Sequence, residues 1–330
     1  MKITFNHTDF YYGETIYKRL EALSKRRVIV FSDLIIYENF QAKLETMLEA
    51  DWLIVPKGFE AFETIKELAS FIARKNVADL LIIGQPDLLD LGLFVAGNTK
   101  IENCYLFPTG FDDLPRFIKG ESTIFSENAL ILQNKITPAW LDFDFHFFEA
   151  SNQDLLSLFV RLIEIYYFDL KSDLNELFFE FRTRDELTHR KLYTYVGKVA
   201  ETEIFNHDFF YFKRLLLNAF KRIMAEKDIK MTAFLIHIYL LKKYFAVEFK
   251  LDNLLKWVSH LGFQLEIPEK LSLTRLIDQM MLAFNGKMNL FNPNTNQLET
   301  LEIGEIEVLN VLQEYKEWIK GAFDEQSKSN

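Results

Sequence analysis

The chain has 330 residues, 49% of them hydrophobic, and a formal net charge of −10 at pH 7. This length suits two domains of ordinary size, and the apolar fraction supports a buried core without disulfides or structural metals. The acidic balance argues against a nucleic-acid-binding protein, because neutralising phosphates requires a surplus of lysine and arginine.

The number of cysteines and the hydropathy of the chain indicate in which cellular compartment the protein is expected. Cys104 is the single cysteine, which excludes an intrachain disulfide and a paired-cysteine metal motif. We expect it to be a small buried side chain. The opening stretch MKITFNHTDFYYGE lacks the apolar run of a signal peptide, and the chain has no run of about 18 uncharged apolar residues. These features predict a cytoplasmic protein that does not interact with membranes.

Strand-like and helix-like segments alternate through the first half of the chain. Strands are expected at 26–33, 51–58, 80–83, 103–110 and 138–145, and helices at 37–50, at 60–76 and after Gly84. This alternation predicts a Rossmann-like α/β domain with a parallel sheet over residues 1–150. Ligands of such sheets bind at the carboxyl ends of the strands, beside helix N-termini.

The second half has long helical periods and few turn signals. Helices are expected at 152–170, 185–202, 208–227, 230–246, 251–262 and 271–284. Residues 151–330 are therefore predicted to form an all-α domain. An aromatic run at 209–213, FFYFK, could stack a base or a sugar, but packing in a helical core is the favoured interpretation.

A series of short motifs lies between residues 84 and 304, each motif occurring once. The segment GQPDLLDLGLFVA, which follows the strand at 80–83, opens the series, and Pro108-Thr109 and Pro138 to Asp142 come next. The remaining members are Glu164, Asp173, Leu177, Phe178, Met281, Lys287, Ile303 and Gly304. In order and spacing the series resembles 3-dehydroquinate synthase and its relatives, the sugar cyclases and the iron-dependent polyol dehydrogenases.

The resemblance implies NAD and a divalent metal, commonly zinc, held in a cleft between an α/β and an all-α domain. It also implies a homodimer formed through the α/β domain. The synthases convert a seven-carbon phosphate sugar acid by transient oxidation, phosphate elimination, reduction and ring closure. The positions that correspond to the family's dinucleotide contacts are Gly58, Gly84, Gln85, Asp90 and Thr109.

The dinucleotide turn departs from the family pattern. Gln85 and Pro86 stand where the family has a second and a third glycine, and Pro86 has no N–H to offer a phosphate. One interpretation is a remodelled nucleotide turn. The favoured one is an ordinary strand-to-helix connection, in which Pro86, Asp87 and Asp90 promote the start of the helix and the aspartates repel phosphate. Of the family's Gly-Glu-Lys loop, Gly58 remains.

The expected substrate loop is acidic. It reads GFDDLPRFIKGEST, where Lys119 lies near the family's lysine but in the wrong order relative to Gly120. Asp112 and Asp113 make the loop unsuited to a phosphorylated substrate. We expect Arg116 and Lys119 to be solvated. Lys119 and Lys287 are the candidate catalytic residues.

The metal site is incomplete in the sequence. Glu164 corresponds to the family's glutamate ligand, and His207 with the adjacent Asp208 lies within one residue of the first histidine. The second histidine is missing, and His237 lies too far along the chain. The favoured alternative is a buried Glu164 paired with a lysine or arginine, and a His207 that serves at a helix N-terminus. A catalytic zinc requires about three protein ligands.

The favoured hypothesis is a divergent dehydroquinate synthase-like pseudoenzyme with degraded NAD and metal sites, which acts in binding or regulation. The alternative is an active lyase or cyclase of the superfamily that uses Glu164, His207 and Lys287 on a small phosphorylated ligand in the inter-domain cleft. A third possibility is a false resemblance, with an unrelated helical interaction module in the second half.

Overall fold

The computed structural model describes residues 1–5, 8–14, 16–24, 26–126, 129–151, 153–168, 173–202, 216–217, 220, 223–248, 251–269, 272–274, 277–278, 281 and 286–327. The chain divides into two compact units. The first unit comprises Met1–Gln153 and His189–Glu201, and the second comprises Asp154–Thr188 and Thr202–Asn330. Residues 189–201, which the sequence analysis assigns to the helical domain, thus pack with the first unit.

In the described part of the first unit, seven strands form one sheet in the order β1-β2-β9-β6-β5-β3-β4. Their bounds are Lys2–Phe5 (β1), Thr8–Gly13 (β2), Arg27–Asp33 (β3), Glu49–Val55 (β4), Asp79–Gly84 (β5), Asn103–Pro108 (β6) and Trp140–Asp144 (β9). All neighbours pair in parallel except β1, which runs antiparallel to β2. The predicted parallel α/β sheet is therefore confirmed.

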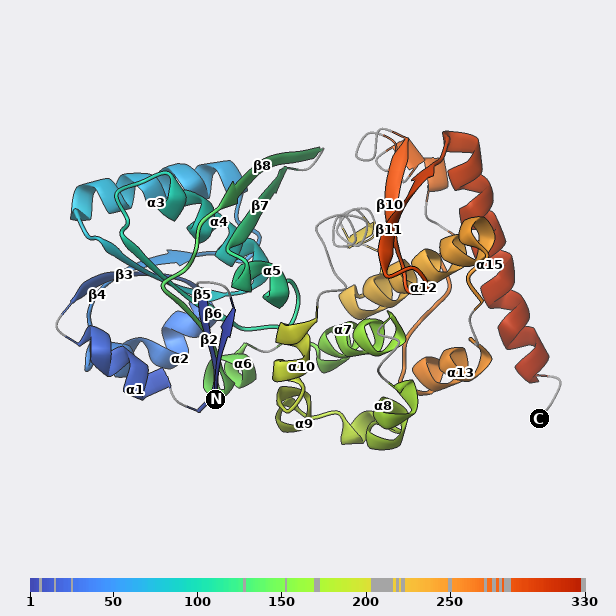
Figure 1. The fold of residues 1–330 in the computed structure, drawn as a ribbon, viewed down its shortest axis with the longest axis horizontal. Coiled ribbons are helices and arrows are strands. Elements are labelled where there is room, and N and C mark those ends of the chain that lie inside the picture. Colours follow the sequence, from blue (N-terminus) through green and yellow to red (C-terminus); the bar gives the residue numbers. More distant parts are fainter. Residues whose placement is uncertain are drawn as a thin grey trace. The chain divides into compact units, whose positions relative to one another are not determined.

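Helices cover both faces of this sheet (Figure 1). One face carries α1 (Ile16–Leu20), the 3-10 turn η1 (Glu21–Leu23), α2 (Leu34–Glu45) and α6 (Phe145–Ala150), and the other carries α3 (Ala61–Lys75) and α4 (Pro86–Gly97). The short α5 (Leu114–Ile118) leads into a hairpin of β7 (Glu121–Ser126) and β8 (Ala129–Lys135), which contacts α4. Neither the hairpin nor β1 and β2 is expected from the sequence.

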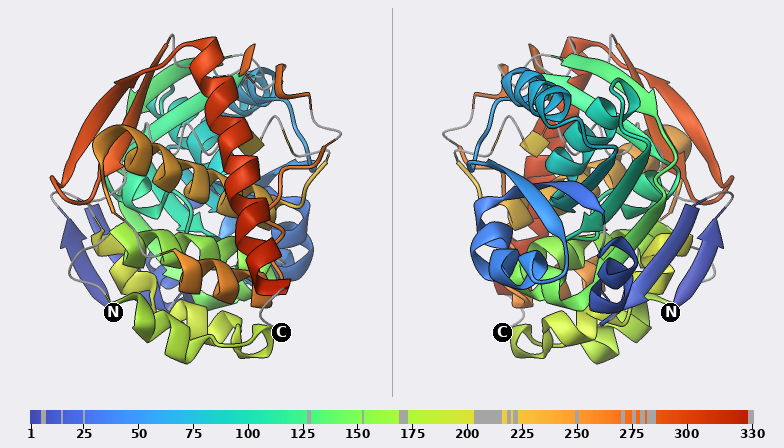
Figure 2. Two further views of the ribbon diagram at one scale, coloured as in Figure 1. Left: turned by 90° about the vertical axis from the view of Figure 1, so that its right-hand side faces the viewer. Right: turned by 90° about the vertical axis from the view of Figure 1, so that its left-hand side faces the viewer.

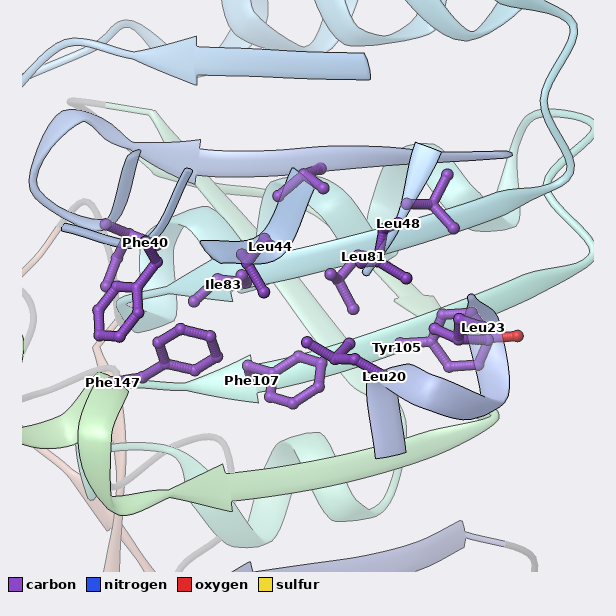
Figure 3. Close-up of a cluster of buried hydrophobic side chains, with 13 residues drawn as sticks. Leu20, Leu23, Phe40, Leu44, Leu48, Leu81, Ile83, Tyr105, Phe107 and Phe147 are labelled. Carbon is purple, nitrogen blue, oxygen red and sulfur yellow. The ribbon is translucent and has the colours of Figure 1, made fainter. Parts of the chain in front are cut away.

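The core of the first unit explains why its central strands are continuous apolar runs. Helices on both faces bury β5 at all six positions, so alternation of polar and apolar residues is lost. On the α2 face, Leu81 and Ile83 of β5 meet Phe107 of β6 and Phe147 of α6 (Figure 3). Phe147 packs edge-on against Phe107 at 5.6 Å between ring centroids. This packing fixes the strand ends, where a ligand of such a sheet is expected.

The described part of the second unit is helical apart from one hairpin. Its helices are α7 (Leu155–Phe168), α8 (Leu174–Glu180), α12 (Glu226–Phe245), α13 (Asp252–His260) and α15 (Glu305–Ser327), with a 3-10 turn η2 (Arg184–Glu186). The unpredicted hairpin pairs β10 (Lys287–Asn292) with β11 (Gln297–Glu302). The long α15 packs against α12 (Figure 2). The predicted helical character of this half is confirmed.

Some predicted helices differ from the structure. The segment 185–202 was expected as one helix but forms η2, α9 (His189–Tyr193) and α10 (Val196–Glu201). The predicted helix at 208–227, with its aromatic run, lies mostly outside the described residues, and so does much of 271–284. Among the described helices, none combines the length and the apolar character needed to cross a bilayer.

Candidate functional site

Because β2, β3, β4, β5, β6 and β9 are parallel, their carboxyl ends meet at one border of the sheet, which we call the carboxyl edge. Four strands end there in a residue of interest, namely Gly13 of β2, Asp33 of β3, Gly84 of β5 and Asp144 of β9. The turn at Gly58 follows β4, and Thr109 follows β6. All the candidate dinucleotide residues except Asp90 therefore lie along this edge. Their contacts decide what they can do.

The turn after β5 offers few backbone donors. Gln85 is the N-cap of α4, and Pro86 occupies the first turn without an N–H. The N–H groups of Leu88 and Leu89 both donate to the Gln85 carbonyl, at 3.0 and 3.1 Å. A Cβ on Gly84 would lie 3.2 Å from Leu88 Cδ2, so the strand end already touches the helix closely. Asp87 adds a negative charge to this turn. The helix α4 does begin at Pro86, with Asp87 in its first turn, as the sequence predicts.

Asp33 ends β3 and Gly58 follows β4, the two strands beyond β5 in the sheet. Gly58 has a φ of +78°, a left-handed conformation that favours glycine, and nothing lies within 4 Å of the position of an added Cβ. The Asp33 carboxylate accepts the Ile36 N–H at 2.9 Å and so caps α2. Burial raises the pKa of Asp33, against the two backbone N–H groups that lower it. Sequence reasoning missed Asp33, although a carboxylate that directly follows a buried strand is a recognisable signal.

Gln153 covers the end of β6. Its Nε2 donates to the Thr109 carbonyl at 2.6 Å, and Thr109 N–H donates to the Gly84 carbonyl at 3.0 Å. A Cβ on Gly110 would lie 2.6 Å from Gln153 Oε1. The polar backbone at this strand end is therefore satisfied by the chain itself.

Asp90 forms an ion pair inside the first unit. Arg116 Nη1 and Nη2 donate to the two carboxylate oxygens of Asp90 at 2.5 and 2.8 Å, and Thr123 N–H donates to Oδ1 at 2.8 Å. Arg116 Nη2 also donates to Asp113 at 2.8 Å. Burial raises the pKa of Asp90 to about 6, although Arg116 opposes this shift. The pair joins α4 to α5 and β7.

The expected solvation of Arg116 is wrong, because only 5% of the residue is exposed. The sequence shows Asp112 and Asp113 beside it but not Asp90, which lies 26 positions away. Lys119, at the end of α5, is exposed as expected. Arg116, itself a residue of the acidic loop, thus neutralises the charge of Asp113.

Tyr193 of α9 contacts the backbone at the carboxyl ends of β2 and β9. Its hydroxyl lies 2.6 Å from the Phe143 carbonyl and accepts the Gly13 N–H at 2.6 Å. Its ring packs edge-on against Phe145 at 5.2 Å between centroids. Burial raises the pKa of Tyr193. This residue explains why 189–201 belongs to the first unit, and no local sequence signal identifies it.

Tyr193→Phe is expected to lower the free energy of unfolding of the first unit by about 1–3 kcal/mol, because the Gly13 N–H loses its acceptor. Urea denaturation measures this loss, and amide hydrogen exchange at Gly13 should accelerate. Tyr37→Phe, in α2 of the same unit, serves as the control, because the ring contact of Tyr37 with Trp52 at 5.2 Å between centroids can be kept by phenylalanine. Unchanged exchange at Gly13 would contradict the assigned hydrogen bond.

In the second unit, Glu164 is fully buried in α7, and its Oε2 lies 3.6 Å from Nη1 of Arg161, which is also 0% exposed. This is the ion pair that the favoured alternative for Glu164 expects. His207 and Asp208 lie outside the described residues. Among the residues that the structure describes, no three His, Cys, Asp or Glu side chains gather as a metal-ligand group.

In the second unit, His237 contacts the Phe291 carbonyl and Lys287 contacts Glu302. His237 Nε2 lies 3.3 Å from the Phe291 carbonyl, and burial lowers the pKa of His237 to about 3. Lys287 lies on β10, where its Nζ is 3.2 Å from Glu302 and its side chain is 66% exposed. The described contacts of Lys287 are those of a surface ion pair.

Comparisons with protein-family models and with curated proteins found no match to the sequence. Solved structures, in contrast, match over nearly the whole chain. A 2-deoxy-scyllo-inosose synthase complexed with carbaglucose-6-phosphate, NAD+ and Co2+ matches with a TM-score of 0.74 and 12% identity, covering 95% of this chain and 99% of that chain. The 2-epi-5-epi-valiolone synthase of Streptomyces hygroscopicus, with NAD+ and Zn2+ bound, gives a TM-score of 0.72 and 13% identity, covering 96% and 98%.

Glycerol dehydrogenase of Schizosaccharomyces pombe also matches, with a TM-score of 0.66 and 8% identity, covering 98% of this chain and 92% of that chain. At such identities the likeness concerns the fold. It extends to both sugar phosphate cyclases and iron-type dehydrogenases, the groups that the sequence motifs resemble. The chain therefore has the fold of the dehydroquinate synthase-like superfamily.

Proposed function

We propose that this protein is a catalytically inactive member of the dehydroquinate synthase-like superfamily that acts by binding or regulation. In this proposal the dinucleotide and metal positions have been turned into structural contacts. The fold is retained, because its apolar strands and helices do not depend on the cofactor.

The observation that carries the proposal is the turn Gly84-Gln85-Pro86. A pyrophosphate is held by backbone N–H groups that point out of a glycine-rich turn at a helix N-terminus. Here Pro86 has no N–H, and the N–H of Leu88 is already donated to the Gln85 carbonyl. The acidic Asp87 would repel the phosphates. The residues at this turn do not fit a dinucleotide pyrophosphate.

The metal position supports the same proposal. A divalent cation would have to approach Glu164 next to the guanidinium of Arg161, in a fully buried environment where like charges repel strongly. A zinc site also needs further ligands, and His237 lies against the Phe291 carbonyl. The described residues around Glu164 do not fit a catalytic metal.

Thermal denaturation with and without NAD+ and Zn2+ tests the proposal. A ligand at 100 times its Kd stabilises a protein by roughly 2.7 kcal/mol, which would raise Tm by roughly 5–10 °C. We expect neither NAD+ nor Zn2+ to change Tm. A clear rise with NAD+ in the wild-type protein would overturn the proposal and favour an active enzyme.

The variant Gln85→Gly/Pro86→Gly sharpens this experiment, because it restores backbone donors to the turn after β5. Each Tm is compared with that of the same variant without NAD+, so that the cost of the added glycines cancels. A gain of NAD+-dependent stabilisation in this variant alone would identify the turn as the feature that excludes the dinucleotide.

A further inference from the structure

The segment 189–201 packs on the first unit, although the residues on either side of it belong to the second. Thr188 and Thr202, which precede and follow it, lie in the second unit. Its helices α9 and α10 contact α6 and α5 of the first unit. We call this segment the strap. Because the chain leaves the first unit at both ends of the strap, only the contacts of the strap itself hold it there.

Two contacts of the strap do not depend on pH near neutrality. The Tyr193 hydroxyl accepts the Gly13 N–H at 2.6 Å and lies 2.6 Å from the Phe143 carbonyl. Burial raises the pKa of Tyr193 above that of an ordinary tyrosine, so the hydroxyl stays neutral. A Cβ on Gly197 would lie 3.0 Å from the Tyr12 hydroxyl, so α10 approaches β2 closely.

The third contact involves His189, the only histidine of the strap. Its ring meets Phe148 edge-on at 5.3 Å between centroids, and Phe148 is fully buried. Among the residues that the structure describes, His189 Nε2 is buried and has no hydrogen-bond partner. A neutral imidazole can leave this nitrogen without a hydrogen, whereas an imidazolium carries a hydrogen on both nitrogens. Protonation therefore creates a charged, buried N–H donor without an acceptor, which is costly.

Titratable groups on the elements that α9 meets affect how readily His189 takes up a proton. They are Glu14 after β2, Asp142 and Asp144 at the end of β9, and His146 and Glu149 of α6. The charge of the exposed Glu149 favours a charged His189, but burial opposes it with the larger effect, so the pKa of His189 is lowered. Glu14 lies 3.7 Å from Arg190. A proton on His189 is therefore disfavoured while the strap is docked.

From this arrangement we propose that the strap is a pH-sensitive element, docked on the first unit while His189 is neutral and released when His189 takes up a proton. Release uncovers the rings of Phe143, Phe145 and Phe148, which contact Tyr193 or His189 in the docked strap. The proton thus controls access to an aromatic surface of the first unit. This inference goes beyond the proposed function and does not depend on it.

Amide hydrogen exchange at Gly13 reports the release, because the Tyr193 hydroxyl accepts this N–H. Exchange is measured on the whole chain at pH 7.5 and 5.5 and expressed as a protection factor, which removes the intrinsic pH dependence of exchange. A released His189 titrates near 6.5, and a docked one titrates lower. We expect the protection factor of Gly13 to fall at pH 5.5, by at most about tenfold, because the released strap binds a proton that the docked strap excludes.

His189→Phe keeps an aromatic ring against Phe148 but cannot be protonated, so the protection of Gly13 should no longer fall at pH 5.5. His146→Phe is the matched control, because His146 lies in the same unit and its ring contacts those of Tyr17 and Phe145. It should keep the fall that wild type shows. An equal fall in His189→Phe and wild type, or no fall in wild type, would overturn the proposal.

The comparison of wild type with His189→Phe cancels Asp142, whose carboxyl titrates in both proteins. NMR titration of the His189 ring in the wild-type protein gives a second measurement, which decides the matter if His189→Phe does not fold. Release by protonation requires a pKa below 6.5 for His189 in the docked strap. A pKa at or above this value would show that the proton does not favour release.

Discussion

Arg116→Met is expected to lower the free energy of unfolding of the first unit by about 3–5 kcal/mol, because it leaves two buried carboxylates without their cation. Arg116 and Asp90 have 4% and 2% of their side chains exposed, so water cannot replace the lost ion pair. Asp113, the second partner, lies 2.8 Å from the same guanidinium. Urea denaturation followed by tryptophan fluorescence measures the change.

Arg27→Met is the matched control for Arg116→Met. Arg27 lies in the same unit and pairs with Asp51 at 2.8 Å, but its side chain is 46% exposed. Its loss should change the free energy of unfolding by no more than about 1 kcal/mol. Equal losses in the two variants would show that burial of the Arg116 pair has no energetic consequence.

The stability of the first unit is expected to fall as pH rises from about 4 to about 7, through Asp142. Burial raises the pKa of Asp142 to about 7, Asp144 adds to the rise, and Arg19 and the N-terminal ammonium oppose it. In the unfolded chain the pKa is near 3.8. Between these values the folded protein keeps a proton that the unfolded chain has lost, so unfolding becomes easier with rising pH.

Asp142→Asn removes this titration. Relative to the variant, wild-type protein should lose about 1.4 kcal/mol of unfolding free energy for each pH unit within this window. Taking the difference between the two proteins cancels Asp90, whose pKa of about 6 acts in the same direction. Parallel stability curves for wild type and variant would contradict the raised pKa of Asp142.

The order of the elements from β3 to β6 could be predicted from the sequence, because local periodicity indicates it. Buried β3 and β5 are short apolar runs, and α3 has an amphipathic pattern. The start of α4 was also predictable, since Pro86 suits only the first turn of a helix. The order and spacing of the motifs from Gly84 to Gly304 indicated the superfamily fold, and the residues after Gly84 indicated the altered turn.

Partners far apart in the chain were not predictable. Arg116 carries the same local signature as a surface arginine, and only the packing of α4 on β7 brings Asp90 to it. Tyr193 and Gly13 are 180 residues apart, so no sequence window contains both. The β10-β11 hairpin was missed because β11 is mostly polar and exposed, and β10 is a strand of six residues in which polar and apolar residues are mixed.

By itself, the sequence determined the succession of elements from β3 to β6, the loss of glycines at the turn after β5 and the candidate positions at the strand ends, since each depends on neighbouring residues. Only the tertiary structure decided which arginine neutralises which buried carboxylate. Asp90 meets Arg116, and Glu164 meets Arg161. Such pairs form where packing excludes water, because a buried charge is stable only beside a counter-charge that the fold brings to it.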